Sequence, residues 1–130
     1  MSHVRMGKVQ LQIMRVLWDK GRANAREITD VLNAQEPIAH STVQTLLRKL
    51  EAKGAVGHEA VARTFVFFPL VAENNVRRGA TQDLLQQVFG GSAGELMSYL
   101  LKHERVSKKE LAEIRRIIDE KSRKPQRGKS

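Results

Sequence analysis

The sequence predicts a mainly α-helical fold with one small β hairpin. Apolar residues recur every three or four positions in six segments of the chain, which is the spacing of one buried helix face. Residues 55–59 and 64–68 instead contain short β-branched or aromatic runs, and their close succession predicts the two strands of a hairpin. Aromatic residues make up 5% of the chain and prolines number three. Aliphatic side chains must therefore build most of the core, and helix is favoured.

The first two helices are marked by their ends and by their apolar stripes. The first ends at Gly21, and Trp18 follows its stripe and is expected in the core. That stripe comprises Val9, Ile13, Met14 and Leu17. Asn24, with Glu27 three residues later, is an N-cap signature that opens the second helix. Pro37 stops the second helix, whose stripe comprises Ile28, Val31 and Leu32.

The third helix carries the strongest pattern in the chain. Ser41 and Gln44 have the spacing of a capping box at its start. Gly54 is well placed as the glycine that follows its C-terminus. The buried face comprises Val43, Leu46, Leu47 and Leu50, at positions i, i+3, i+4 and i+7.

The predicted hairpin follows directly. Arg63 lies at its tip, and Pro69 ends its second strand. Phe65 and Phe67 are expected to join the core of the N-terminal helices. His58 is a lone histidine on the first strand, and we expect it to be simply exposed.

Three further helices are predicted after the hairpin. Gly90 and Gly91 separate the first of them from the second. The last two are opened by capping pairs, Ser92 with Glu95 and Ser107 with Glu110. The three stripes comprise Val76, Ala80, Leu84 and Val88; Leu96, Met97, Leu100 and Leu101; and Leu111, Ile114, Ile117 and Ile118.

This order of elements predicts a winged helix-turn-helix, in which three helices with a short second connection precede a β hairpin. We expect this domain over residues 1–71, a helical dimerisation region over residues 72–121 and a basic disordered tail over residues 122–130. Winged helices bind DNA, but they also serve as protein-interaction modules within larger complexes. Both classes of function are therefore considered.

The charge balance favours a polyanionic partner. Lys and Arg number 23 against 14 Asp and Glu, giving a net charge of +9 and a pI near 10.4. Five uncompensated cations lie between Lys121 and Lys129, which leaves about +4 for the rest of the chain. A basic tail thus accounts for part of the excess, and charge alone does not decide for double-stranded DNA.

The outward face of the third helix decides for DNA. No acidic residue occurs between Ile38 and Leu50, whereas an interaction module should present apolar or acidic residues there. Gln, Arg and Thr can read base edges, and a helix N-terminus favours a phosphate. An ordinary solvated face is the alternative. The predicted DNA-binding residues are His40, Ser41, Thr42, Gln44, Thr45, Arg48, Lys49 and, on the wing, Arg63.

Several other functions find no support. The chain has no cysteine, and its four histidines lack ligand spacing, so no metal site, disulfide or other cofactor is expected. No nucleophile, acid or base stands in a catalytic arrangement, so no enzyme is expected. No apolar run approaches the roughly 20 residues of a membrane span. Residues 1–9 lack a hydrophobic signal region, and we expect a soluble cytoplasmic protein.

Five segments resemble the penicillinase and methicillin-resistance repressors. They are residues 13–18 (IMRVLW), 41–50 (STVQTLLRKL) with Lys53-Gly54, 64–71 (TFVFFPLV), 89–92 (FGGS) and 107–118. The resemblance covers residues 9–121. It implies a winged-helix transcriptional repressor that binds an inverted-repeat operator as a homodimer, with a resistance or stress gene as a candidate target.

The resemblance also implies candidate partners for induction, a sensor protease or an antirepressor. Antibiotic-responsive relatives are cleaved between an Asn and a Phe, and the corresponding pair here is Tyr99-Leu100, or Ser98-Tyr99 if the alignment shifts by one. No Asn-Phe pair occurs in the chain, which is a departure from the pattern for induction by cleavage. Copper-responsive relatives bind metal through cysteines, and that mode is excluded here.

The C-terminal helices are expected to form the homodimer interface, because some 50 residues bury too little surface to be stable alone. Folding back onto the winged helix is the alternative. The predicted dimerisation residues are Val76, Leu84, Val88, Leu96, Leu100, Leu101, Leu111, Ile114, Ile117 and Ile118.

Overall fold

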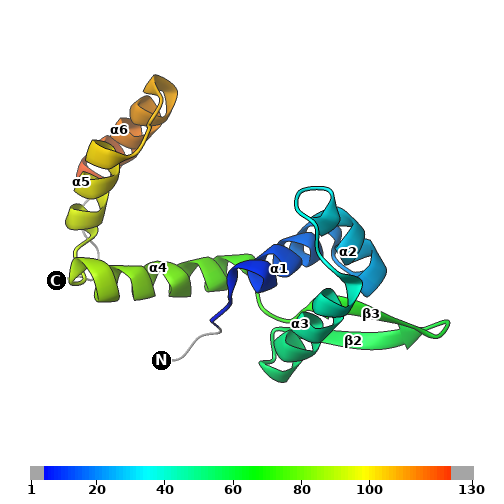
Figure 1. The fold of residues 1–130 in the computed structure, drawn as a ribbon. Helices are drawn as coiled ribbons and strands as arrows, with labels where there is room; N and C mark the ends of the chain where they lie inside the picture. The colour runs from blue at the N-terminus through cyan, green and yellow to red at the C-terminus, as the bar shows by residue number, and fades with distance from the viewer. Residues whose placement is uncertain (1–4, 124–130) are drawn as a thin grey trace. The chain divides into compact units, whose positions relative to one another are not determined.

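The computed structural model describes residues 5–123, and their fold is mainly helical with one small sheet (Figure 1). The elements are α1 (Lys8–Lys20), β1 (Ala23–Asn24), α2 (Ala25–Asn33), α3 (His40–Ala52), β2 (Val56–Val61), β3 (Thr64–Pro69), α4 (Glu73–Phe89), α5 (Ala93–His103) and α6 (Lys108–Arg123). The predicted fold class is confirmed. All six predicted helices and both hairpin strands are present, and α6 runs on through the first residues of the segment expected to be a tail. Residues 124–130 of that segment lie outside the described residues.

The sheet has one strand that the sequence did not predict. Its order is β1-β3-β2, and all pairing is antiparallel. The short strand β1 pairs Ala23 with Phe67 and Asn24 with Val66, so it joins the start of α2 to the wing. Two residues carry no periodic pattern, and only their pairing with β3 makes them a strand.

Aliphatic side chains of α1, α2 and α3 form the core of the first compact unit. The buried apolar residues are Ile13, Met14, Val16, Leu17, Ala23, Ile28, Leu32, Val43, Leu47, Leu50, Ala55, Val56 and Phe67. Three predicted core residues, Val9, Trp18 and Leu46, are only partly buried against this set. Two others are exposed. Val31 is 38% exposed, because it lies at the edge of the α2 stripe, and Phe65 is 54% exposed near the outer end of the hairpin.

Local signals explain most of the helix ends. The Asn24–Glu27 capping box forms in both directions, with each backbone N–H 2.8 Å from the other residue's side-chain oxygen. Gly21 and Gly54 have φ values of 85° and 83°, the left-handed conformation that glycine adopts without strain. The predicted capping box of Ser41 and Gln44 is wrong. Helix α3 begins at His40, two residues earlier than a Ser41 cap requires, with Ala39 as an N-cap that offers no side-chain acceptor.

Two side-chain contacts fasten the ends of this unit. The buried Gln10 side chain accepts hydrogen bonds from the Gly7 backbone N–H and from Lys53 Nζ, both at 3.0 Å. Trp18 is half-buried rather than fully enclosed, and its indole N–H donates to the carbonyl oxygen of Val71 at 2.9 Å. The second contact fixes the chain where the wing ends and α4 begins.

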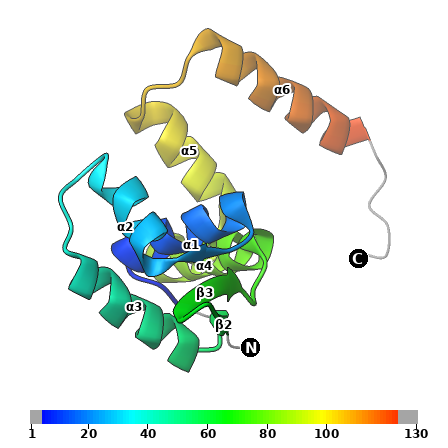
Figure 2. The ribbon, with the colours of Figure 1, turned by 90° about the vertical axis from the view of Figure 1, so that its right-hand side faces the viewer.

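The chain forms two compact units, one ending at Leu84 and the other beginning at Leu85. The second unit contains the end of α4, α5 and α6. Figure 2 shows α5 and α6 joined by an extended segment and diverging from each other. Neither α5 nor α6 has a buried residue. Ser92 caps α5 by accepting from the Glu95 N–H, and Ser107 and Glu110 form the predicted reciprocal pair before α6.

Most of the predicted dimerisation residues are exposed or half-buried in the single chain. Val76 differs from the others, because it is buried within the first unit. Leu101, Leu111, Ile114 and Ile118 line a hollow of about 640 Å³ in the second unit. The apolar side chains left open to solvent on the last three helices are Leu84, Val88, Met97, Tyr99, Leu100, Leu101, Leu111, Ile117 and Ile118.

Candidate nucleic-acid interface

Helix α3 separates its residues into a packed face and an open face. Val43, Leu47 and Leu50 are buried against α1 and α2 and toward the sheet. The opposite face exposes polar and cationic side chains, namely Ser41, Thr42, Gln44, Thr45, Arg48 and Lys49. The first turn of α3 contains no acidic residue, so its N-terminal backbone N–H groups favour an anion such as a phosphate.

The turn between α2 and α3 fixes the angle at which α3 presents this face. The side-chain oxygen of Asn33 accepts from the Ile38 backbone N–H at 2.8 Å. The Gln35 and Glu36 N–H groups both donate to the Leu32 carbonyl at 3.1 Å. These bonds hold the end of α2 to the residues that lead into α3.

His40 is half-buried and is oriented by Thr29. The Thr29 hydroxyl donates to the Ala25 carbonyl at 2.7 Å, and its oxygen lies 3.1 Å from His40 Nδ1. A hydroxyl has one proton to donate, so Nδ1–H of His40 is the donor in the second contact. In the neutral imidazole, Nε2 is therefore left as an acceptor at the N-terminus of α3.

The wing ends in a tight turn made by two residues without glycine. Ala62 and Arg63 have φ values of 50° and 71°. Two successive positive φ values are the signature of the type I′ turn that suits a two-residue hairpin. The turn closes between Val61 and Thr64, which are paired partners, and it places Arg63 at the tip as predicted.

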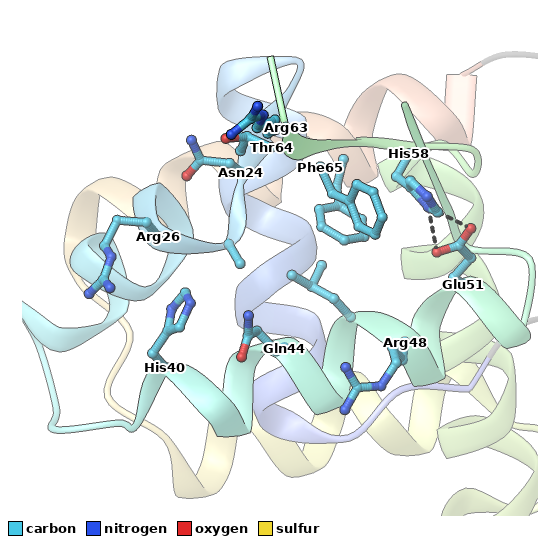
Figure 3. Close-up of a pocket in the computed structure, with 13 residues that line it drawn as sticks. Asn24, Arg26, His40, Gln44, Arg48, Glu51, His58, Arg63, Thr64 and Phe65 are labelled. Atoms are coloured by element: carbon cyan, nitrogen blue, oxygen red, sulfur yellow. Dashed lines mark hydrogen bonds and ion pairs between the residues drawn. The ribbon is translucent and has the colours of Figure 1, made fainter. Parts of the chain in front are cut away.

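A groove of about 640 Å³ lies between α3 and the wing. Figure 3 shows His40, Gln44 and Arg48 along α3 on one side, with Arg63, Thr64 and Phe65 of the wing on the other. The lining residues are Asn24, Ala25, Arg26, His40, Gln44, Leu47, Arg48, Glu51, His58, Arg63, Thr64, Phe65 and Phe67. The groove thus combines hydrogen-bonding groups, three arginines and an apolar floor.

The predicted site residues fall into two groups. His40, Gln44, Arg48 and Arg63 are brought together around the groove. Ser41, Thr42, Thr45 and Lys49 lie on the exposed face of α3 but do not line it. Thr45 still reaches the groove indirectly, because its hydroxyl oxygen lies 3.4 Å from Arg48 Nη2.

Sequence reasoning missed Arg26, Glu51 and His58. Arg26 follows the Asn24 cap by two residues, and the cap could have placed it on the exposed first turn of α2. His58 was expected to be simply exposed, and this prediction is wrong. Its side chain is 30% exposed, and its Nδ1 lies 2.9 and 2.8 Å from the two carboxylate oxygens of Glu51.

Ion pairs also connect the wing to the body of the domain. On β2, Glu59 pairs with Arg22, which lies just before β1. Within residues 5–123, no group of three His, Cys, Asp or Glu side chains is placed to hold a metal ion. None of the helices in that range is long and apolar enough to cross a membrane.

Comparison with known proteins connects this geometry to a family. A profile of the Penicillinase repressor family matches residues 6–120. The chain belongs to this family. It is a family of transcriptional repressors and not of enzymes, so the protein is a DNA-binding transcriptional repressor.

Individual relatives support the assignment over the same range. The penicillinase repressor of Bacillus licheniformis is 26% identical over 121 residues, covering 92% of this chain and 94% of the relative. The methicillin resistance regulatory protein MecI of Staphylococcus aureus strain N315 is 23% identical over 116 residues, covering 89% and 94%.

A solved structure supports the winged helix in particular. It is the Bacillus licheniformis BlaI repressor, as a monomeric form in complex with the blaP half-operator. The TM-score is 0.50 at 28% identity, and the match covers 57% of this chain and 90% of that one. The matched part of this chain is thus about as long as the first unit.

Proposed function

We propose that this family member represses transcription by binding an inverted-repeat operator as a homodimer. The observation that carries the proposal is the groove between α3 and the wing, with Gln44, Arg48 and Arg63 around it. In this proposal α3 enters the major groove, and the wing contacts the neighbouring backbone. Gln and Arg can then read adenine and guanine edges, while Arg63 at the wing tip contacts phosphate or the minor groove.

The relatives support DNA as the partner. BlaI of Bacillus licheniformis was solved with a half-operator, and the region of similarity includes the winged helix. A half-operator engages one recognition helix, and a full operator would engage two. A two-fold homodimer places identical helices on the two halves of a palindrome, about 34–36 Å apart.

The second unit supplies surfaces suited to a homodimer. Leu100, Leu101, Leu111, Ile117 and Ile118 are open to solvent on α5 and α6. Exposed apolar side chains that gather into a patch mark a protein–protein interface, and Leu101, Leu111 and Ile118 line one hollow. A second copy of the same surface would bury it, and a two-fold interface is self-complementary by symmetry.

The test is selection of bound duplexes from a random DNA pool by the full-length protein. We expect an enriched inverted repeat whose half-sites lie about one helical turn apart, 10–10.5 base pairs. Enrichment of a single, asymmetric half-site would contradict the dimeric arrangement. No enrichment, together with retention of a protein partner instead, would favour an interaction module.

A further inference from the structure

Glu51 and His58 connect the recognition helix to the wing across one end of the groove. Glu51 lies in the last turn of α3, and His58 lies on β2. Nδ1 of His58 is within 2.9 Å of both carboxylate oxygens, and both side chains line the groove. Figure 3 shows the two side chains facing each other beside Phe65. The pair therefore sets the spacing between the two elements that would contact DNA.

Two aromatic rings hold the imidazole in place on its strand. The ring centres of His58 and Phe65 are 4.3 Å apart with an angle of 32° between their planes. Phe67, the direct cross-strand partner of His58, lies at 5.5 Å. A cation near an aromatic face is stabilised, so this environment suits the protonated imidazole as well as the neutral one.

The charges around the pair explain why protonation of His58 would matter for DNA binding. Glu51 is the one acidic residue among those that line the groove, where Arg26, Arg48 and Arg63 provide positive charge. Glu59 neighbours His58 on β2, but it alternates to the other face and pairs with Arg22. The facing strand β3 places the uncharged rings of Phe65 and Phe67 beside the imidazole. A carboxylate in this groove would repel DNA phosphates unless a cation compensates it.

We propose that Glu51 and His58 form a positioning pair, which holds the wing on α3 and takes up a proton when DNA fills the groove. This inference rests on the proposed placement of DNA. Nδ1–H of His58 can donate to Glu51 whether or not Nε2 carries a proton, so the wing is held in both states. In the complex, the imidazolium also cancels the charge of Glu51 beside the phosphates.

The sign of the effect follows from linkage. The complex holds more protons than the free protein, so DNA affinity rises as pH falls, by up to about tenfold per pH unit for each proton taken up. Histidine is the side chain that changes charge between about pH 5 and 8. Arg48 and Arg63 stay charged throughout this range. His40 also lines the groove, so its contribution needs a separate measurement.

The experiment measures binding of the full-length protein to a random-sequence duplex by fluorescence anisotropy. A duplex of about 30 base pairs is long enough for two half-sites one turn apart. Affinity is measured from about pH 6 to pH 8 at constant ionic strength. His58→Gln keeps an amide donor for Glu51 but cannot be protonated. We expect this variant to match the affinity of the wild type at pH 8 and to bind more weakly than the wild type at pH 6. The slope of its log affinity against pH should be smaller by about one proton per bound protomer.

Glu51→Gln provides a second variant with a different expected result. Removing the acid should tighten binding at pH 8 by about fivefold, the effect of one unit charge near a phosphate in water. The pH profile should also become flatter. Glu59→Gln is the matched control on β2 and should leave the pH profile unchanged. His40→Gln should retain the component that His58→Gln removes.

Proton uptake is measured directly by the NMR signals of the His58 ring at pH 7. We expect the protonated fraction to rise when duplex DNA is added. A wild-type pH profile in both His58→Gln and Glu51→Gln would overturn the inference, as would His58 signals that do not respond to DNA. A wild-type protein that binds no duplex at any pH and low salt would instead overturn the proposed function.

Discussion

Arg48 and Lys49 are neighbours on α3, yet only Arg48 lines the groove. Arg48→Ala should weaken binding to the selected duplex by about 1–3 kcal/mol and relax preference at one position of each half-site. Lys49→Ala should weaken selected and random duplexes alike, as loss of a phosphate contact does. Competition binding with single-base variants of the selected site measures both. Equal losses on selected and random DNA for Arg48→Ala would make it a phosphate contact as well.

Trp18 supports the fold through one polar atom. Trp18→Phe keeps a six-membered aromatic ring but removes the pyrrole ring, and it leaves the Val71 carbonyl without its donor. We expect the free energy of unfolding to fall by about 1 kcal/mol, the usual net value of such a hydrogen bond. Urea titration followed by circular dichroism measures the change. Tyr99→Phe, which removes a hydroxyl from an exposed ring, is the control, and a fall as large in that variant would contradict the assignment to the hydrogen bond.

At the scale of the elements, the wing turn carries backbone strain. Residues other than glycine adopt positive φ at a cost of roughly 1–2 kcal/mol, and Asn tolerates that conformation better than Ala. Ala62→Asn should therefore raise the free energy of unfolding by about 0.5 kcal/mol. Ala60→Asn makes the same chemical change on β2, where extended backbone gains nothing from Asn. Thermal melts that show equal destabilisation of both variants would count against the strained turn.

The sequence predicts the elements well where their signal is local. The stripe of α3 and the Asn24–Glu27 cap depend on residues three or four apart, and the structure has both. The predicted Ser41 cap is wrong because α3 starts two residues earlier, with Ala39 as its N-cap, and Ser41 lies inside the first turn. The prediction that Phe65 joins the core is wrong. Phe65 alternates along the strand in the same way as Phe67, but it lies further out on the hairpin, where no helix covers it.

Part of the groove could be predicted in the same way, and part could not. Arg48 and Gln44 follow from the open face of one helix, which a helical wheel shows. Glu51 and His58 come from different elements, seven residues apart, and their contact depends on how β2 packs against α3. No spacing rule connects a helix residue to a strand residue, so only the tertiary structure shows this pair.

The whole molecule is expected to be a dimer. Leu100→Asp combined with Ile114→Asp should give a monomer, because each places a charge in an apolar interface where it would be buried without a partner. Light scattering at micromolar concentration measures the mass, and circular dichroism checks that the first unit is still folded. Lys102→Asp, on the polar side of α5, is the control and should remain dimeric. Wild-type protein that is monomeric at that concentration would contradict the expectation.

The charge of the whole molecule leads to a salt prediction. A dimer with two recognition helices and two wings should neutralise roughly 6–10 phosphates. Its affinity for duplex DNA should then fall by about 10³–10⁵ between about 50 and 200 mM salt. Anisotropy titrations at several salt concentrations give the slope directly. Affinity independent of salt would rule out DNA as the main partner.

The Trp18–Val71 contact also makes the protein its own optical probe. The chain contains one tryptophan, and its indole N–H is bound to the backbone where the wing leads into α4. Loss of this contact would hydrate the indole and move its emission to longer wavelength. Emission recorded during a titration with DNA, or with any inducing molecule, would therefore show whether that junction opens, without an attached dye.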